Sequence, residues 1–105
     1  MKNRKTALLG IAAAFIAGPA SAGPGSLAGP LCGVLKGVAP KTRGLEPAAA
    51  RAQLVRALAA AFDRDAAKLR EVRIHIDEAT SDACPEDRQR MLDNAQAKTL
   101  LEAID

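Results

Sequence analysis

Apolar residues recur at helical spacing through the middle of the chain. Alanine, the strongest helix former, is dense from Ala48 to Ala61, and Pro47 stands where a helix would begin. Large apolar residues fall on one helical stripe along this segment and beyond it: Leu54, Leu58, Phe62, Leu69, Val72 and Ile76. The pattern predicts one long central helix from Pro47 to about Thr80, with a kink near residues 63–65. The alternative is that Asp63 and Asp65 cap a second helix.

One part of this segment also alternates as a strand does. Residues 72–77 read Val-Arg-Ile-His-Ile-Asp, with apolar and polar positions in turn. The chain offers no second strand to pair with it, and an isolated strand is not stable. We therefore expect helix here as well.

A shorter helix is predicted before the central one. Four apolar residues follow Pro30 at helical spacing, namely Leu31, Val34, Leu35 and Val38. Gly33 and Gly37 weaken the helix, so we expect about two turns. Residues 40–44 are expected to form a linker, and residues 23–29, rich in Gly and Pro, a flexible N-terminal segment.

The last helix is predicted to begin at Pro85. Glu86 and Asp87 lie in its first turn, where negative charge suits the helix dipole. Its apolar face would comprise Met91, Leu92, Ala95, Leu100, Leu101 and Ile104. Together these patterns predict an all-α domain over residues 30–105, a small bundle of about three helices.

The first 22 residues have the pattern of a cleaved secretory signal peptide. Lys2, Arg4 and Lys5 precede an apolar run from Ala7 to Ala17, and Ala20-Ser21-Ala22 supplies the small residues of a cleavage site. The apolar run is shorter than the roughly 20 residues of a membrane span. We expect cleavage between Ala22 and Gly23, and a periplasmic or secreted protein without stable membrane insertion.

Cleavage would also change the charge of the protein. The whole chain has a formal net charge of +3, but residues 23–105 contain twelve basic and twelve acidic residues. The basic character therefore belongs to the leader, and it does not indicate nucleic-acid binding. Phe62 is the sole aromatic residue after the leader, and we expect it to anchor the core.

Small domains usually need a stabilising cross-link, and the two cysteines, Cys32 and Cys84, could form one. An even number of cysteines in an exported chain predicts a disulfide. Intermolecular pairing and two free thiols are the alternatives. A bridge within one chain would tie the first helix to the start of the last.

Residues that could carry catalysis are few. His75 is the single histidine, and a general base there would need Asp77 or Asp82 to orient it. Residues two positions apart lie on different sides of a helix, so we expect His75 to be a solvated helical residue. Zinc at Cys32, Cys84 and His75 lacks the close-set cysteine pair and the fourth ligand of a structural site. No redox, haem or phosphate-loop motif occurs, so we predict no enzyme, no metal and no cofactor.

The charged residues after the second cysteine have two readings. Glu86, Asp87, Arg88 and Arg90 would form either a solvated first helical turn or a charged binding edge. The layout Cys32…Cys84-Pro85-Glu86-Asp87-Arg88-Gln89-Arg90 resembles periplasmic acid-stress chaperones of the HdeA type. The resemblance implies an all-helical fold with one long-range disulfide and binding of unfolded clients in acid.

Two functions are therefore expected from different classes. The first is a non-enzymatic accessory or protein-interaction module of the cell envelope, acting through helix surfaces on an unknown protein partner. The second is an acid-stress chaperone. Protonation of the twelve carboxylates would take residues 23–105 to about +12, which would loosen a thin core that the disulfide holds together.

Overall fold

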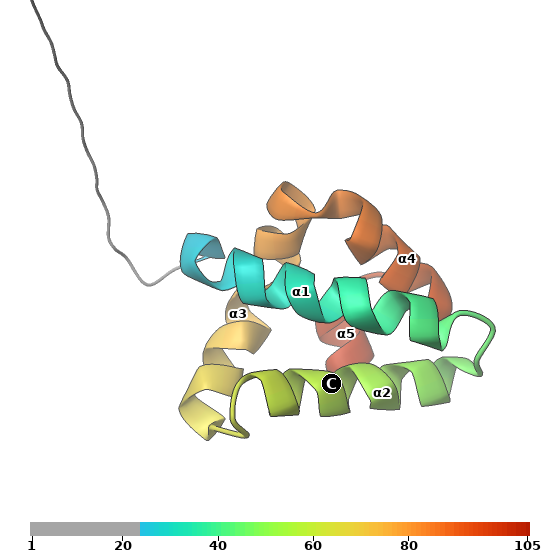
Figure 1. Ribbon diagram of the computed structural model, residues 1–105, viewed down its shortest axis with the longest axis horizontal. Helices are drawn as coiled ribbons and strands as arrows, with labels where there is room; N and C mark the ends of the chain where they lie inside the picture. Colours follow the sequence, from blue (N-terminus) through green and yellow to red (C-terminus); the bar gives the residue numbers. More distant parts are fainter. Residues whose placement is uncertain (1–23) are drawn as a thin grey trace, which may run out of the picture.

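The computed structural model describes residues 24–105 of the chain. This part is all-helical, with five helices: α1 (Pro24–Thr42), α2 (Pro47–Ala61), α3 (Ala66–Ala83), α4 (Pro85–Ala95) and α5 (Leu100–Ile104). Figure 1 shows α1 and α2 running beside each other, with α3, α4 and α5 behind and around them. The all-α class is confirmed, but the number of helices and the single long central helix are wrong.

Helix α1 is longer than its glycines and prolines predict. It spans 19 residues, includes Pro30 and Pro40, and takes in most of the expected linker at 40–44 and of the expected flexible segment. One side of it is buried and carries Leu31, Leu35, Val38, Ala39 and Thr42. Packing of that side against α2, α3 and α4 outweighs the low helix propensity of the sequence. Gly44, with a φ of 82°, lies in the turn that follows.

The predicted central helix is broken between α2 and α3. Asp63 and Arg64 have φ values of 60° and 54°, which no helix continues through. Asp65 then caps α3, because its side chain accepts a hydrogen bond from Lys68 N at 3.0 Å. The alternative of a second helix capped by aspartate is the one that the structure adopts. Residues 72–77 lie within α3, so the helical prediction for them is confirmed.

The predicted last helix is also two helices. Pro85 begins α4 with Glu86 and Asp87 in its first turn, as predicted. The helix ends at Ala95, and its C-cap Gln96 has a left-handed φ of 49°. Thr99 then caps α5 by accepting from Glu102 N at 3.0 Å. Arg51 of α2 braces this turn, since its guanidinium donates to the carbonyls of Ala95 and Gln96 at 2.9 and 3.0 Å.

One apolar core joins all five helices. Its members come from every element, and the largest fully buried apolar ones are Leu31, Leu35, Leu54, Ile76, Met91 and Leu100. Phe62 is buried at the end of α2, as expected for a core anchor. Cys32 in α1 and Cys84 between α3 and α4 form a disulfide, with their Cα atoms 6.0 Å apart. The predicted bridge within one chain, from the first helix to the start of the helix at Pro85, is confirmed.

Candidate functional site

An apolar pocket opens where α2, α3 and α5 meet. It has a volume of about 130 Å³ and is lined by Val55, Leu58, Ala59, Leu69, Val72, Arg73 and Ile104. Leu58 and Val72 also belong to the hydrophobic core, so the floor of the pocket is part of that core. An engineered apolar cavity of similar volume, about 150 Å³, holds a benzene ring. The pocket therefore has room for about one apolar side chain.

The rim of the pocket is partly apolar and partly charged. Val55 is 42 % exposed, and it extends the apolar lining toward solvent. Arg73 on the opposite wall makes an ion pair with the side chain of Asp105. Both partners of that pair are about half exposed, so the ion pair contributes little to the stability of the rim.

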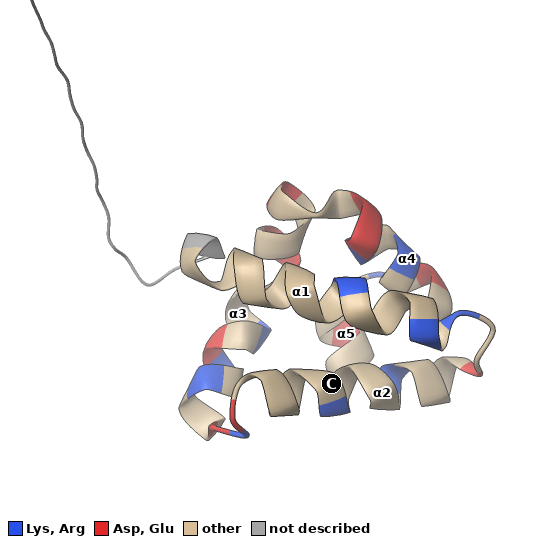
Figure 2. Cartoon of the chain, viewed as in Figure 1, with Lys and Arg blue, Asp and Glu red and all other residues tan. Residues whose placement is uncertain are grey.

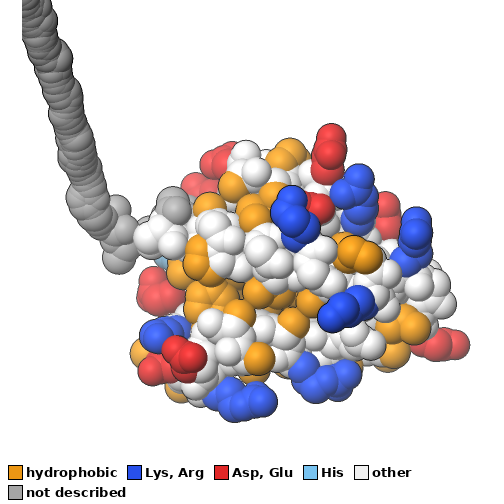
Figure 3. Space-filling model, in the orientation of Figure 1, with side chains coloured by type: hydrophobic (Ala, Val, Ile, Leu, Met, Phe, Trp, Pro, Cys, Tyr) orange, Lys and Arg blue, Asp and Glu red, His pale blue; other side chains and the backbone are white. Residues whose placement is uncertain are grey.

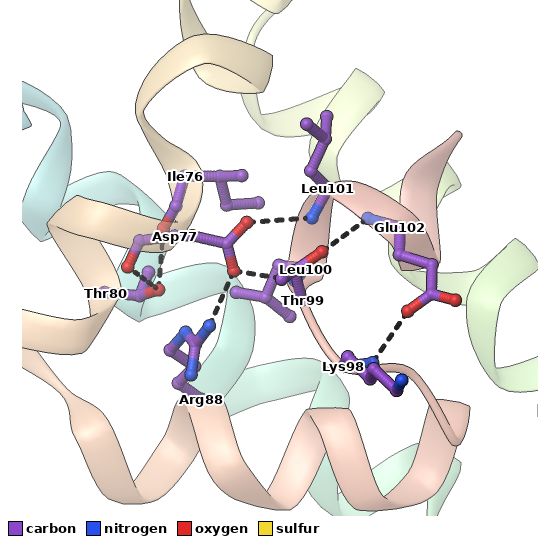
Figure 4. A network of polar contacts seen from close by, with 9 residues as sticks. All are labelled: Ile76, Asp77, Thr80, Arg88, Lys98, Thr99, Leu100, Leu101 and Glu102. Atoms are coloured by element: carbon purple, nitrogen blue, oxygen red, sulfur yellow. Dashed lines mark hydrogen bonds and ion pairs between the residues drawn. The ribbon is translucent and has the colours of Figure 1, made fainter.

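Asp77 holds the short helix that forms one wall of the pocket. From α3 its carboxylate lies between α4 and the start of α5 (Figure 4). It accepts hydrogen bonds from Leu100 N at 2.7 Å and Leu101 N at 3.1 Å, and from Arg88 Nη2 at 2.8 Å. The first turn of a helix has unpaired N–H groups and a partial positive charge, which a carboxylate stabilises. One side chain of α3 thus fixes α5, and with it Ile104 at the pocket.

This role of Asp77 is not visible in the sequence. The sequence suggests Asp77 as an orienting partner for His75, whereas in the structure its carboxylate contacts α4 and α5. No local signal marks the role, because the groups involved lie 11, 23 and 24 positions away. Arg88 shares the network, and its buried Nε has no hydrogen-bond partner within residues 24–105. The ion pair to Asp77 is therefore the main polar contact of that guanidinium.

His75 does not join a catalytic arrangement with the aspartates. Its Nε2 lies 3.5 Å from Glu71 Oε1, one helical turn away, and its side chain is 22 % exposed. The residue is thus less solvated than the sequence suggested. Asp82 is exposed near the end of α3.

The charged residues after Cys84 split between two roles. Arg88 belongs to the Asp77 network, whereas Asp87 lies 3.5 Å from Lys36 Nζ and 3.2 Å from Arg90 Nη1. Both Asp87 and Arg88 are mostly buried, so the first turn of α4 is not simply solvated. Glu86 stays exposed.

Metal ligands do not gather in the described part of the chain. Residues 24–105 contain no group of three His, Cys, Asp or Glu side chains placed to hold a metal ion. Cys32 and Cys84 are joined to each other, so neither offers a thiolate.

Several expectations concern the region before the described residues. The signal peptide at 1–22 and its cleavage between Ala22 and Gly23 lie outside residues 24–105. Within that range, none of the helices combines the length and the apolar character that a membrane span requires. The disulfide is compatible with an oxidising, exported location. The chain matches no model of a known protein family, no curated protein and no solved structure.

Proposed function

We propose that this chain is a small exported, non-enzymatic protein that binds a protein partner through the pocket between α2, α3 and α5. The pocket is the observation that carries the proposal, because it continues a core onto the surface at Val55. Its volume suits one aliphatic side chain of the partner, and Arg73 at the rim suits a carboxylate beside that side chain. A helix presenting an aliphatic and an acidic residue one turn apart would supply both.

A site-specific photo-crosslinker tests this proposal in the cells that make the protein. Placed at Val55 it should give one discrete protein adduct, whereas at Ala52, exposed on the same helix but outside the pocket, it should give none. An aspartate at the neighbouring lining position, Ala59→Asp, should abolish the adduct at Val55. Equal adducts at both positions, or an adduct that Ala59→Asp leaves unchanged, would argue against the pocket.

An activity assay tests the non-enzymatic part of the proposal. We expect no turnover of generic esterase, protease or glycosidase substrates. Turnover that disappears in His75→Ala would make the protein an enzyme and end this proposal.

A second candidate function is an acid-stress chaperone of the HdeA type, and the Asp77 network favours it. One carboxylate supplies the ion pair to Arg88 and the acceptors for Leu100 N and Leu101 N, and acid conditions in general remove charge from carboxylates. Loss of these contacts would release α5 from the wall of the pocket and expose the apolar side chains of α2 and α3. The disulfide would keep the loosened chain together.

Aggregation of a client protein at about pH 2.5, with and without this chain, separates the two candidates. A chaperone should suppress the aggregation in acid and lose the effect at neutral pH. No suppression in acid, or equal suppression at both pH values, would exclude the second candidate.

A further inference from the structure

A second cleft lies between the C-terminal half of α1 and the first turns of α4. Its volume is about 380 Å³, and it is lined by Lys36, Ala39, Pro40, Arg43, Asp87 and Arg90. Figure 2 shows blue segments in the second half of α1, in the turn after it and in α4. Three cationic side chains and one carboxylate therefore face this cleft, and its other lining residues are apolar.

Asp87 organises two of the three cations. Its carboxylate is only 15 % exposed, and it lies 3.5 Å from Lys36 Nζ and 3.2 Å from Arg90 Nη1. The Lys36 and Arg90 side chains are mostly exposed, so their remaining N–H groups are open to a ligand. Arg43 has no ion-pair or hydrogen-bond partner among the described residues. The cleft therefore carries two positive charges beyond those that Asp87 neutralises.

Among the described residues that line the cleft, Asp87 alone is acidic. Neither α1 nor α2 contains an acidic residue within its bounds, and the turn between them has Glu46 alone. Carbonyl groups at the end of α1 carry partial negative charge, but Ala39 O accepts from Asn94 Nδ2 at 2.9 Å and from Thr42 Oγ1 at 3.2 Å. Glu86 lines an adjoining hollow, which shares Lys36 and Asp87 with the cleft. It does not line the cleft that contains Arg43.

We propose that this cleft binds a phosphoryl group that carries two negative charges. A guanidinium group can donate two parallel hydrogen bonds to the oxygens of one phosphate. Arg43 and Arg90 supply two guanidinium groups beside the ammonium of Lys36. Ala39 and Pro40 offer no side-chain hydrogen bond that would read a base or a sugar. The ligand is therefore recognised by its phosphoryl group alone, as free phosphate or as a lipid phosphomonoester headgroup. This inference does not rest on the pocket at Val55, which lies on other elements.

Titration with inorganic phosphate, followed by backbone amide NMR shifts at low ionic strength, tests the cleft. The isolated protein with its disulfide intact should show saturable shifts centred on Lys36, Arg43 and Arg90. Arg43→Gln should weaken binding about threefold or more, since one exposed cation contact is lost. Arg56→Gln is the matched control, because it removes the same charge from an exposed position on α2 outside the cleft.

The outcomes separate a site from a general charge effect. Shifts that do not saturate, or equal weakening by Arg43→Gln and Arg56→Gln, would overturn the proposal. Vesicles of phosphatidylcholine with one-fifth phosphatidic acid then identify the source of the ligand. Binding of these vesicles that depends on Arg43 indicates a lipid headgroup, and saturable binding of phosphate without vesicle binding indicates a free ligand. Vesicle binding without saturable phosphate binding would contradict recognition by the phosphoryl group.

Discussion

At Asp77 a single carboxylate meets three separate groups, one in α4 and two at the start of α5. Its partner Arg88 is mostly buried, and no acceptor in the described part of the chain reaches its buried Nε, so the guanidinium depends on this contact. Removing the charge would leave Arg88 buried and poorly paired, which is more costly than losing an exposed ion pair. The effect of a substitution here should therefore exceed that of any other aspartate in α3.

Asp77→Asn tests this at the scale of one residue. The amide keeps one oxygen as an acceptor but loses the ion pair and one of the two acceptors for the first turn of α5. We expect the free energy of unfolding to fall by about 1–3 kcal/mol in urea denaturation. Asp82→Asn is the matched control, since Asp82 is exposed on the same helix, and it should change stability by less than about 0.5 kcal/mol. Equal effects of the two substitutions would contradict the role of Asp77.

The same variant also bears on the acid-stress proposal. If charge on Asp77 keeps α5 on the pocket, Asp77→Asn should bind an apolar fluorescent dye more strongly than the wild type at neutral pH. Dye fluorescence equal to that of Asp82→Asn would show that the charge on Asp77 does not control the exposure of the pocket.

At the scale of helices, the sequence predicted where helix occurs better than where it ends. The apolar stripe continues in phase from Leu54 to Ile76, so periodicity alone favours one helix. The break comes from two consecutive residues with positive φ, Asp63 and Arg64, and neither residue type demands that conformation. The visible signal of the break is the cap at Asp65, which favours the alternative of a second helix.

The other boundaries have similar physical causes. Gln96 ends α4 in a left-handed conformation that glycine would have marked in the sequence. Helix α1 extends past its glycines because Leu31, Leu35 and Val38 gain burial on three neighbouring helices, which local propensity does not report. The pocket could not be predicted either. Its lining residues come from α2, α3 and α5, whereas the sequence predicts one continuous helix in place of α2 and α3 and another in place of α4 and α5.

Arg64→Gly tests the origin of the break between α2 and α3. Glycine adopts positive φ without steric cost, whereas arginine does not, so the turn should become more stable. We expect the free energy of unfolding to rise by about 0.5–1 kcal/mol after the added entropy of the unfolded chain is subtracted. Arg56→Gly within α2 should instead lower it by about 1 kcal/mol. A loss of stability in both variants would show that the turn at Arg64 is not strained.

At the scale of the whole molecule, charge is divided unevenly along the chain. Residues 24–61 contain five basic and one acidic residue, whereas residues 62–105 contain seven basic and eleven acidic ones. The balanced charge of residues 24–105 therefore conceals a basic part formed by α1 and α2. In Figure 3 orange side chains follow the seam between these two helices, and blue side chains border it. Association with any anionic partner should start at this basic part and slow as salt is added.

The disulfide is the largest single contribution to stability that we predict. The bridge closes a loop of 52 positions between Cys32 and Cys84, which the chain-entropy estimate values at roughly 4 kcal/mol. Small domains have about 5–15 kcal/mol in total. The double variant Cys32→Ser/Cys84→Ser should therefore unfold at a much lower urea concentration. A midpoint within experimental error of the oxidised wild type would contradict this.

The same bridge changes what a protease can do to the molecule. The two cysteines enclose the second half of α1 and all of α2 and α3, so a cut in the exposed turn at residues 63–65 falls inside the closed loop. The two pieces then stay covalently joined, and their reassembly is a unimolecular event that does not depend on protein concentration. A nicked copy would therefore remain one particle at any dilution and keep its elements together.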